Sequence, residues 1–251
     1  MATDAEDRSV LTRQASPPDA VVPYGPHEEQ VADVRFARDA APGRPLVVLV
    51  HGGFWRPRFD RAHLRPMTEA LAAAGWTTLT PEYRRIPGHP DLAVEDVHAA
   101  VRAVPRLPGL AGRRVLLAGH SAGGHLALHA AATFELARAP AGVLALAPVA
   151  DLRRAQALRL GGDAVPAFLG RDAGARPDLD PARLPTPVGP VRIVHGTGDG
   201  IVPVGVSESY LRQHPGAVLA AVDCGHFALV DPLSAAWPTV LAALEELAGG
   251  A

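Results

Sequence analysis

Short apolar runs alternate with longer segments rich in alanine and leucine along most of this 251-residue chain. The short runs predict strands and are VADVRF (31–36), LVVLV (46–50), WTTLT (76–80), RVLLA (114–118), GVLALA (142–147), VRIVHG (191–196) and AVLAAV (217–222). The longer segments predict helices over 64–75, 91–104, 122–137, 204–214 and 229–248. Because strands that alternate with helices form parallel crossovers, we expect an α/β fold: a mainly parallel sheet with helices on both faces.

The chain length fits one large domain, which we place at residues 21–251. Residues 1–20 are polar, contain proline and show weak periodicity, so they predict a flexible N-terminal tail or a strap. Residues 151–187 interrupt the alternation with a long segment that contains many prolines and glycines. Long insertions between strands are often functional, and we interpret this one as a lid.

Charge and hydropathy exclude several classes of partner. A formal net charge of −2 leaves no basic stripe for a nucleic acid. The longest apolar runs are too short to span a bilayer, and the N-terminus lacks the apolar core of a signal peptide, so we expect a soluble, cytoplasmic protein. The single cysteine, Cys224, excludes an intrachain disulfide and CxxC zinc pairs. We expect no metal and no cofactor, and either a monomer or a homodimer.

A serine lies between two glycines where the strand over 114–118 passes into the helix over 122–137. Gly119, Ser121 and Gly123 fit the pattern G-x-S-x-G. In a strand–turn–helix context, this pattern is typical of a tight turn that exposes a nucleophilic serine above a sheet. The N–H groups at the start of the helix would then lie beside the site of attack.

A serine nucleophile needs a base that takes its proton, and the base needs an acid that orients it. Asp199 follows the predicted strand over 191–196, and His226 follows the next strand, over 217–222. Both residues therefore fall at the edge of the sheet where ligands bind. The chain order Ser, Asp, His is also the order that this arrangement requires. We predict that Ser121, Asp199 and His226 form a catalytic triad.

Other acids and histidines fit these roles less well. Asp223 would have to turn back on its own loop to meet His226, and Asp151 and Asp163 belong to the lid segment. We expect His195 to hold the turn at its strand end rather than act as a base.

The loop after LVVLV reads HGGFW, residues 51–55, and supplies candidate donors for an oxyanion. Glycines allow a backbone to approach a ligand closely, so the N–H groups of Gly53 and Phe54 can join that of Ala122 in an oxyanion hole. We interpret His51 as a residue that fixes this loop. We expect Gly52 to contact the substrate as well.

Several side chains near this loop invite a role in substrate binding. Arg56 and Arg58 offer guanidinium groups to a substrate carboxylate, although arginines are most often solvated surface residues. Phe54, Trp55 and Phe168 offer rings to an aryl group, although aromatic residues near a core more often serve packing.

Two further groups of residues have mainly structural interpretations. Glu82, Arg84 and Arg85 are expected to form an ion-pair network that holds loops around the site. His125 and His129 have the four-residue spacing found in zinc sites, but they lack the glutamate of H-E-x-x-H and a third ligand.

With these motifs, the sequence resembles the serine α/β-hydrolases, and within them the HGG-type esterases related to hormone-sensitive lipase. HGGFW also fits the narrower HGGxW pattern of the arylformamidases, or kynurenine formamidases, and PEYRR (81–85) and GHSAGGHLA (119–127) are similar to family segments. The resemblance covers residue 31 to the C-terminus and is weakest in the lid. It implies the α/β-hydrolase fold and an acyl-enzyme formed on Ser121 from N-formyl-L-kynurenine, an intermediate of tryptophan catabolism.

Three functions remain open from the sequence. The first is a serine hydrolase that cleaves a small arylformamide similar to N-formylkynurenine. The second is a carboxylesterase that acts on short acyl esters, which would use the same triad with a different acyl pocket. The third is a noncatalytic α/β-hydrolase that binds a ligand or a protein, although such proteins normally lack a triad member or an oxyanion glycine.

Overall fold

The computed structural model describes residues 6–133 and 139–249, and within them eight strands form one sheet in the order β1-β2-β4-β3-β5-β6-β7-β8. The strands are β1 (Ala20–Pro23), β2 (Val31–Arg35), β3 (Leu46–Val50), β4 (Thr78–Pro81), β5 (Val115–His120), β6 (Val143–Leu146), β7 (Val191–Gly196) and β8 (Val218–Val222). From β4 to β8 every neighbouring pair is parallel, whereas β1–β2 and β2–β4 are antiparallel. The predicted α/β architecture is confirmed.

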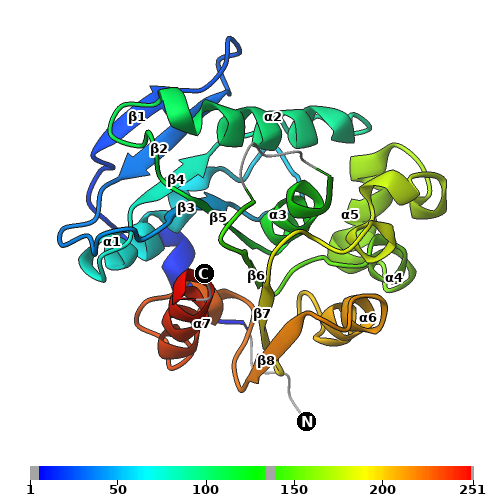
Figure 1. Ribbon diagram of the computed structural model, residues 1–251. Coiled ribbons are helices and arrows are strands. Elements are labelled where there is room, and N and C mark those ends of the chain that lie inside the picture. The colour runs from blue at the N-terminus through cyan, green and yellow to red at the C-terminus, as the bar shows by residue number, and fades with distance from the viewer. Residues whose placement is uncertain (1–5, 134–138, 250–251) are drawn as a thin grey trace.

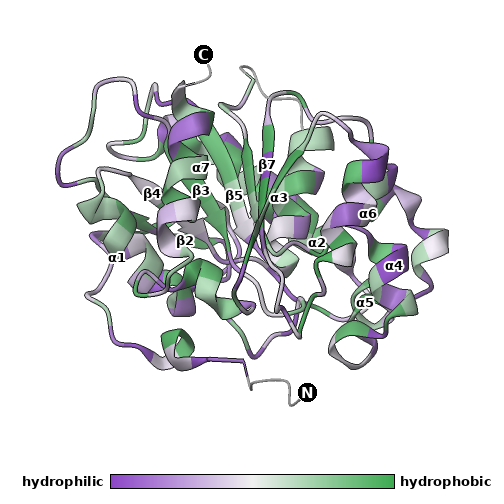
Figure 2. Ribbon diagram, turned by 90° about the horizontal axis from the view of Figure 1, so that it is seen from below, coloured by the Kyte–Doolittle hydropathy of each residue, from purple (hydrophilic) through white to green (hydrophobic). Residues whose placement is uncertain are grey.

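Helices cover both faces of the sheet (Figure 1). They are α1 (Arg65–Ala73), α2 (Pro90–Ala103), α3 (Ala122–Thr133), α4 (Leu152–Ala157), α5 (Leu160–Leu169), α6 (Gly205–Gln213) and α7 (Trp237–Gly249). One core cluster joins the sheet to α2, α3 and α6, and a second joins it to α1 and α7. Figure 2 shows the apolar strands between these layers, and burial on both faces explains why their sequences are apolar runs without alternation.

The sequence analysis did not predict α4 and α5 within the lid segment, and residues 134–137 of the helix predicted over 122–137 lie outside the described residues. β1 and the last helix also differ from the sequence expectation. β1 was not predicted, because it is a short edge strand with alternating half-buried and exposed residues and a proline at its end. The last helix begins at Trp237 rather than at residue 229. A short 3₁₀ helix, Phe227–Val230, precedes it, and Pro232 disfavours a helical conformation at the residue before it.

The register of the sheet brings the predicted motifs to one edge. Val50 of β3 pairs with Gly119 of β5, so the HGGFW loop and the serine turn leave neighbouring strands side by side. Gly196 of β7 pairs with Val222 of β8, which places the loops that carry Asp199 and His226 next to each other. All four loops follow the carboxyl ends of parallel strands, where open α/β sheets bind ligands.

The predicted lid and the N-terminal segment both lie near this edge of the sheet. The predicted lid, residues 151–187, contains α4, α5 and three 3₁₀ turns between β6 and β7. Residues 1–5 of the predicted tail lie outside the described residues, and from Glu6 onward the chain packs against the domain, with Val10 buried. None of the described helices has the length and hydropathy needed to cross a membrane.

Candidate active site

Ser121 lies in a sharp turn between β5 and α3. Its φ of 56° is in the left-handed region, which is uncommon for a residue with a side chain and is often found at functional sites. A Cβ at Gly119 would collide with the carbonyl oxygen of Gly123, and a Cβ at Gly123 would collide with that of Val50. The two glycines therefore allow the turn to close so tightly, as the G-x-S-x-G pattern predicts.

The structure brings His226 and Asp199 into direct contact. His226 Nδ1 lies 2.6 Å from Asp199 Oδ2, and the second carboxylate oxygen accepts hydrogen bonds of 2.8 Å from the N–H groups of Ile201 and Val202. Burial alone would raise the pKa of Asp199, but the hydrogen bonds from His195 and His226 outweigh it and lower the pKa. The ionised carboxylate fixes the proton on His226 Nδ1, which leaves Nε2 as the basic nitrogen.

The other acids and the histidine that the sequence offered for these roles do not contact His226 in this way. Asp151 caps α4 through the N–H of Arg154, Asp163 forms an exposed ion pair with Arg159, and Asp223 is exposed. His195 is buried beneath the acid, where its Nε2 lies 3.4 Å from Asp199 Oδ2 and its Nδ1 lies 2.7 Å from Ser207 Oγ. Its position fits the expectation that it holds the strand-end turn.

Three consecutive residues of the HGGFW loop, Gly53, Phe54 and Trp55, have positive φ angles of 113°, 51° and 53°. In the part of the chain that the structure describes, no group accepts a hydrogen bond from the N–H of Gly53, Phe54 or Ala122. A Cβ at Gly52 would lie 2.9 Å from His120 O and 3.1 Å from Ser121 Cβ, so this glycine lets the loop lie directly against the serine turn. Gly53 and Phe54 line the same cavity as Ser121, and Ala122 follows Ser121 in the chain, so their unpaired N–H groups are candidate donors for an oxyanion.

A cavity of about 970 Å³ lies over these loops and is lined by Ser121, His226, Gly53 and Phe54. Residues 11–15 of the N-terminal segment and residues 158–161 of the lid segment form its outer walls. Six arginines also line it, whereas Asp60 is its one acidic lining residue among those the structure describes. They are Arg8, Arg13, Arg56, Arg58, Arg65 and Arg159.

The family model for the α/β-hydrolase fold matches residues 47–171, which include the HGGFW loop and the serine turn. The chain has the α/β-hydrolase fold. Its relatives include esterase LipU of Mycobacterium tuberculosis, which is 34% identical over 44% of this chain and 38% of its own length. Kynurenine formamidase of Danio rerio is 32% identical over 42% of this chain and 36% of its own length. These matches thus span just over a third of each curated relative.

Solved structures of esterases share the fold of this chain. Esterase B from Lactobacillus rhamnosis, inhibited by a tributyrin phosphonate, superimposes with a TM-score of 0.76 at 19% identity and covers 94% of this chain and 89% of its own. Est2 from Thermogutta terrifontis superimposes with a TM-score of 0.69 at 21% identity and covers 90% and 92% of the two chains. At this identity, the likeness shows the fold.

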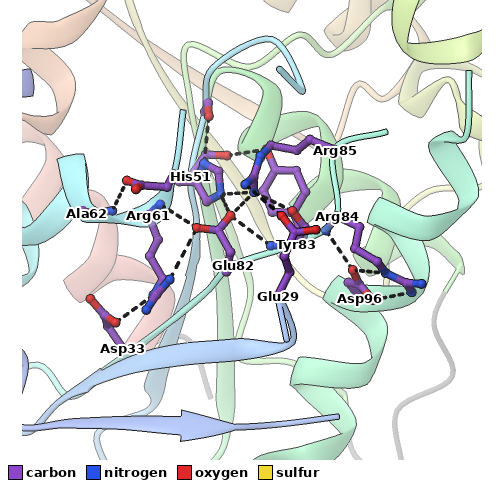
Figure 3. A network of polar contacts seen from close by, with 12 residues as sticks. Glu29, Asp33, His51, Arg61, Ala62, Glu82, Tyr83, Arg84, Arg85 and Asp96 are labelled. Atoms are coloured by element: carbon purple, nitrogen blue, oxygen red, sulfur yellow. Dashed lines mark hydrogen bonds and ion pairs between the residues drawn. The ribbon is translucent and has the colours of Figure 1, made fainter. Parts of the chain in front are cut away.

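A buried polar network holds the HGGFW loop through His51 (Figure 3). His51 Nε2 lies 2.8 Å from Glu82 Oε1, and the same carboxylate forms an ion pair with Arg85 and accepts a hydrogen bond of 3.1 Å from the N–H of Arg61. Tyr83 stacks on the His51 ring and donates a hydrogen bond of 3.1 Å to its carbonyl oxygen. Arg84, which we expected in this network, instead pairs with Asp96 of α2.

Replacing Glu82 by alanine is expected to lower the free energy of unfolding by about 3–5 kcal/mol, because Arg85 would lose its buried partner and keep only a 3.3 Å pair with the more exposed Glu29. The control is Glu95→Ala, which breaks an exposed 3.7 Å pair with Arg84 and should cost about 1 kcal/mol or less. Urea unfolding of both variants measures the difference. Equal losses would mean that the network does not hold the loop.

Trp55 and Phe168 take positions that differ from the predicted substrate contacts. Both are buried, their rings stack with centroids 4.3 Å apart, and neither lines the cavity. Gly52 also lies outside the cavity lining, since it packs against His120 and Ser121. Core packing explains this buried aromatic pair, in which Trp55 of the HGGFW loop packs against Phe168 of α5.

The sequence analysis gave no role to His120, which precedes Ser121. Its Nε2 lies 3.1 Å from the carbonyl oxygen of His226, and the two rings pack with centroids 4.5 Å apart. Burial, together with the nearby His226, lowers the pKa of His120 well below its usual value, so its neutral ring donates this hydrogen bond. His120 occupies a variable position of G-x-S-x-G, so the pattern gave no signal for this contact.

His125 and His129 lie on α3 as their spacing predicts, but each is held by a backbone carbonyl. His125 Nε2 lies 2.8 Å from Leu179 O, and His129 Nε2 lies 3.2 Å from Asp178 O. Among the described residues, no cluster of three histidine, cysteine or acidic side chains could hold a metal ion. The two histidines therefore connect α3 to the segment before β7.

Proposed function

We propose that this chain is a serine hydrolase that cleaves small esters or formamides through an acyl-enzyme. The observation that carries the proposal is the 2.6 Å contact between His226 Nδ1 and Asp199 Oδ2 beside a cavity that His226 shares with Ser121. The strained serine turn and the unpaired N–H groups of the HGGFW loop support it. The noncatalytic alternative is disfavoured, because binding alone requires neither the turn nor the triad.

In the proposed reaction, Ser121 Oγ attacks the carbonyl carbon of the substrate while His226 Nε2 takes its proton. Negative charge develops on the carbonyl oxygen and is stabilised by the N–H groups of Gly53, Phe54 and Ala122. His226 then donates the proton to the departing alcohol or amine, which leaves an acyl group on Ser121. Water attacks this acyl group with His226 again as base, and release of the acid restores the serine.

The finer proposal is that the substrate is an arylformamide similar to N-formylkynurenine. The HGGFW pattern and the kynurenine formamidase relative support it. Arg56 and Arg58 also line the cavity, where they fit a substrate carboxylate. Arg58 is exposed, and Arg56 donates a hydrogen bond to the carbonyl oxygen of Gly161 in the lid segment.

The second candidate is a carboxylesterase for short acyl esters. The esterase relative and the esterase structures support this alternative, and the same triad would serve it. The two candidate functions differ in the acyl group of the substrate and in the need for an arginine that binds a substrate carboxylate.

The decisive comparison is kcat/KM for N-formyl-L-kynurenine beside p-nitrophenyl acetate and butyrate, with Ser121→Ala as the blank. A preference for the formamide supports an arylformamidase, and turnover of the esters alone supports the carboxylesterase.

Arg58→Ala is expected to raise KM for N-formyl-L-kynurenine by about tenfold or more, since a charged hydrogen bond contributes about 1.5–3 kcal/mol. KM for p-nitrophenyl acetate, which has no carboxylate, should stay within about twofold, because no charged contact is lost. Arg159→Ala is the matched control, because Arg159 also lines the cavity but pairs with Asp163. Equal changes for the two substrates would contradict an anchoring role for Arg58.

A further inference from the structure

Residues 6–16, here called the N-terminal strap, run across the edge of the sheet where the cavity lies. Val10 of the strap is buried in the core cluster that also contains Leu64 and Leu229. Arg13 forms a two-pronged ion pair with Asp231, and the Arg8 guanidinium lies 5.5 Å from the centre of the Phe227 ring. The strap is thus fastened to the segment that directly follows His226.

Glu6, at the start of the strap, contacts both loops that carry the proposed acid and base. Its Oε1 accepts a hydrogen bond of 2.8 Å from the N–H of Gly200, the residue after Asp199. Its Oε2 accepts a hydrogen bond of 2.8 Å from the N–H of His226 itself. A Cβ at Gly225 would collide with Oε2, so a glycine at this position allows the carboxylate to approach.

We propose that Glu6 is a positioning residue that ties the Asp199 loop to the His226 loop. The inference rests on the proposed hydrolase function. Hydrogen bonds to a carboxylate are shorter and stronger than those between neutral groups, and one carboxylate here bridges two loops that leave neighbouring strands. The 2.6 Å contact between His226 and Asp199 depends on the relative position of these loops, and misplacing a catalytic group by about 1 Å can cost about a hundredfold in rate.

Other contacts between the loops limit the expected effect. Gly198 N donates a hydrogen bond of 3.1 Å to Cys224 O, and Thr197 N donates one of 2.8 Å to Val222 O. These bonds fix the bases of the two loops, whereas the Glu6 bridge acts at Gly200 and His226, closer to the reacting groups. Loss of the bridge should therefore lower the rate without abolishing it.

The position of Glu6 also predicts which kinetic constant changes. Arg8, Leu11 and Thr12 of the strap line the cavity, but Glu6 does not. Its substitution should therefore lower kcat and leave KM nearly unchanged, because it alters the alignment of the base rather than a surface that contacts substrate. A purely structural role for the strap would instead change KM or thermal stability.

The test compares Glu6→Gln with Asp7→Asn in the full chain, with p-nitrophenyl acetate as substrate. Asp7 is the neighbouring acid, and its carboxylate accepts a hydrogen bond from Ser9 N within the strap. We expect Glu6→Gln to lower kcat by about tenfold, since the charged bridge loses one acceptor, with KM within about twofold. Glu6→Ala removes both acceptors and should lower kcat further, whereas Asp7→Asn should match the wild type.

The outcomes separate this inference from the proposed function. If the wild type turns over the ester in a reaction that requires Ser121 and Glu6→Gln has an unchanged kcat, the positioning role is overturned and the hydrolase stands. Equal losses in Glu6→Gln and Asp7→Asn would also overturn it, as would a loss explained by a lower melting temperature. A wild type without Ser121-dependent turnover would overturn the hydrolase function itself.

Discussion

Replacing Ser121 by alanine is expected to lower kcat/KM for the preferred ester or formamide by about 10⁵-fold or more, as for other serine triads. The hydroxyl is the proposed nucleophile, and without it no acyl-enzyme forms. The fold should persist, because alanine removes one oxygen atom, and the backbone of residue 121 keeps its bonds to Leu146 O and from His125 N. Steady-state kinetics and thermal unfolding measure the two effects separately.

Ser209→Ala is the control for this substitution. The Ser209 hydroxyl is partly buried and donates a hydrogen bond of 2.5 Å to Asp151, so its loss tests the removal of a serine hydroxyl outside the cavity. Its activity should stay within about twofold of the wild type, as for substitutions outside the reacting groups. A Ser121→Ala variant with most of the wild-type rate would refute the nucleophile assignment.

Asp199→Asn is expected to lower kcat by about 10⁴-fold while the fold stays intact. The carboxylate accepts the Nδ1 proton of His226, whereas an amide nitrogen at the same place would favour the opposite tautomer. Because the pKa of Asp199 is lowered by its hydrogen bonds to His195 and His226, the wild-type carboxylate is ionised at neutral pH. The substitution therefore removes a charge that the proposed mechanism needs. Steady-state kinetics at neutral pH measure the loss.

Asp223→Asn and Asp151→Asn are the matched controls, since they make the same chemical change at the rival acids. Asp223 is exposed, and Asp151 caps α4, so asparagine, which also caps helices well, should be tolerated there. Both variants should keep kcat within about threefold of the wild type, as surface substitutions usually do. If Asp151→Asn or Asp223→Asn lost activity while Asp199→Asn retained it, Asp199 would not be the acid.

The fold followed from the sequence because its strands are buried on both faces and read as apolar runs, of which LVVLV of β3 is the clearest. The serine turn was predictable for a local reason: Gly119 and Gly123 are required by contacts within a few residues of Ser121 and with β3. The pairing of Asp199 with His226 could be predicted because both follow adjacent strands. In each case a local pattern determined the position.

Features that depend on long-range contacts could not be predicted. Glu6 meets His226 across 220 positions of sequence, and its neighbours in the chain resemble an ordinary polar tail. Trp55 and Phe168 could be read as substrate contacts or as packing, and their stacked, buried rings favour packing. The role of His120 depends on where His226 lies, which no local pattern specifies.

The central claim is that Ser121 is a nucleophile activated by the folded site. The most direct test treats the native protein with a fluorophosphonate probe and locates the adduct by peptide mass spectrometry, with heat-denatured protein as the control. We predict one adduct on Ser121 of the native protein and none on the denatured protein. A native protein without an adduct on Ser121, or with equal labelling after denaturation, would contradict the account.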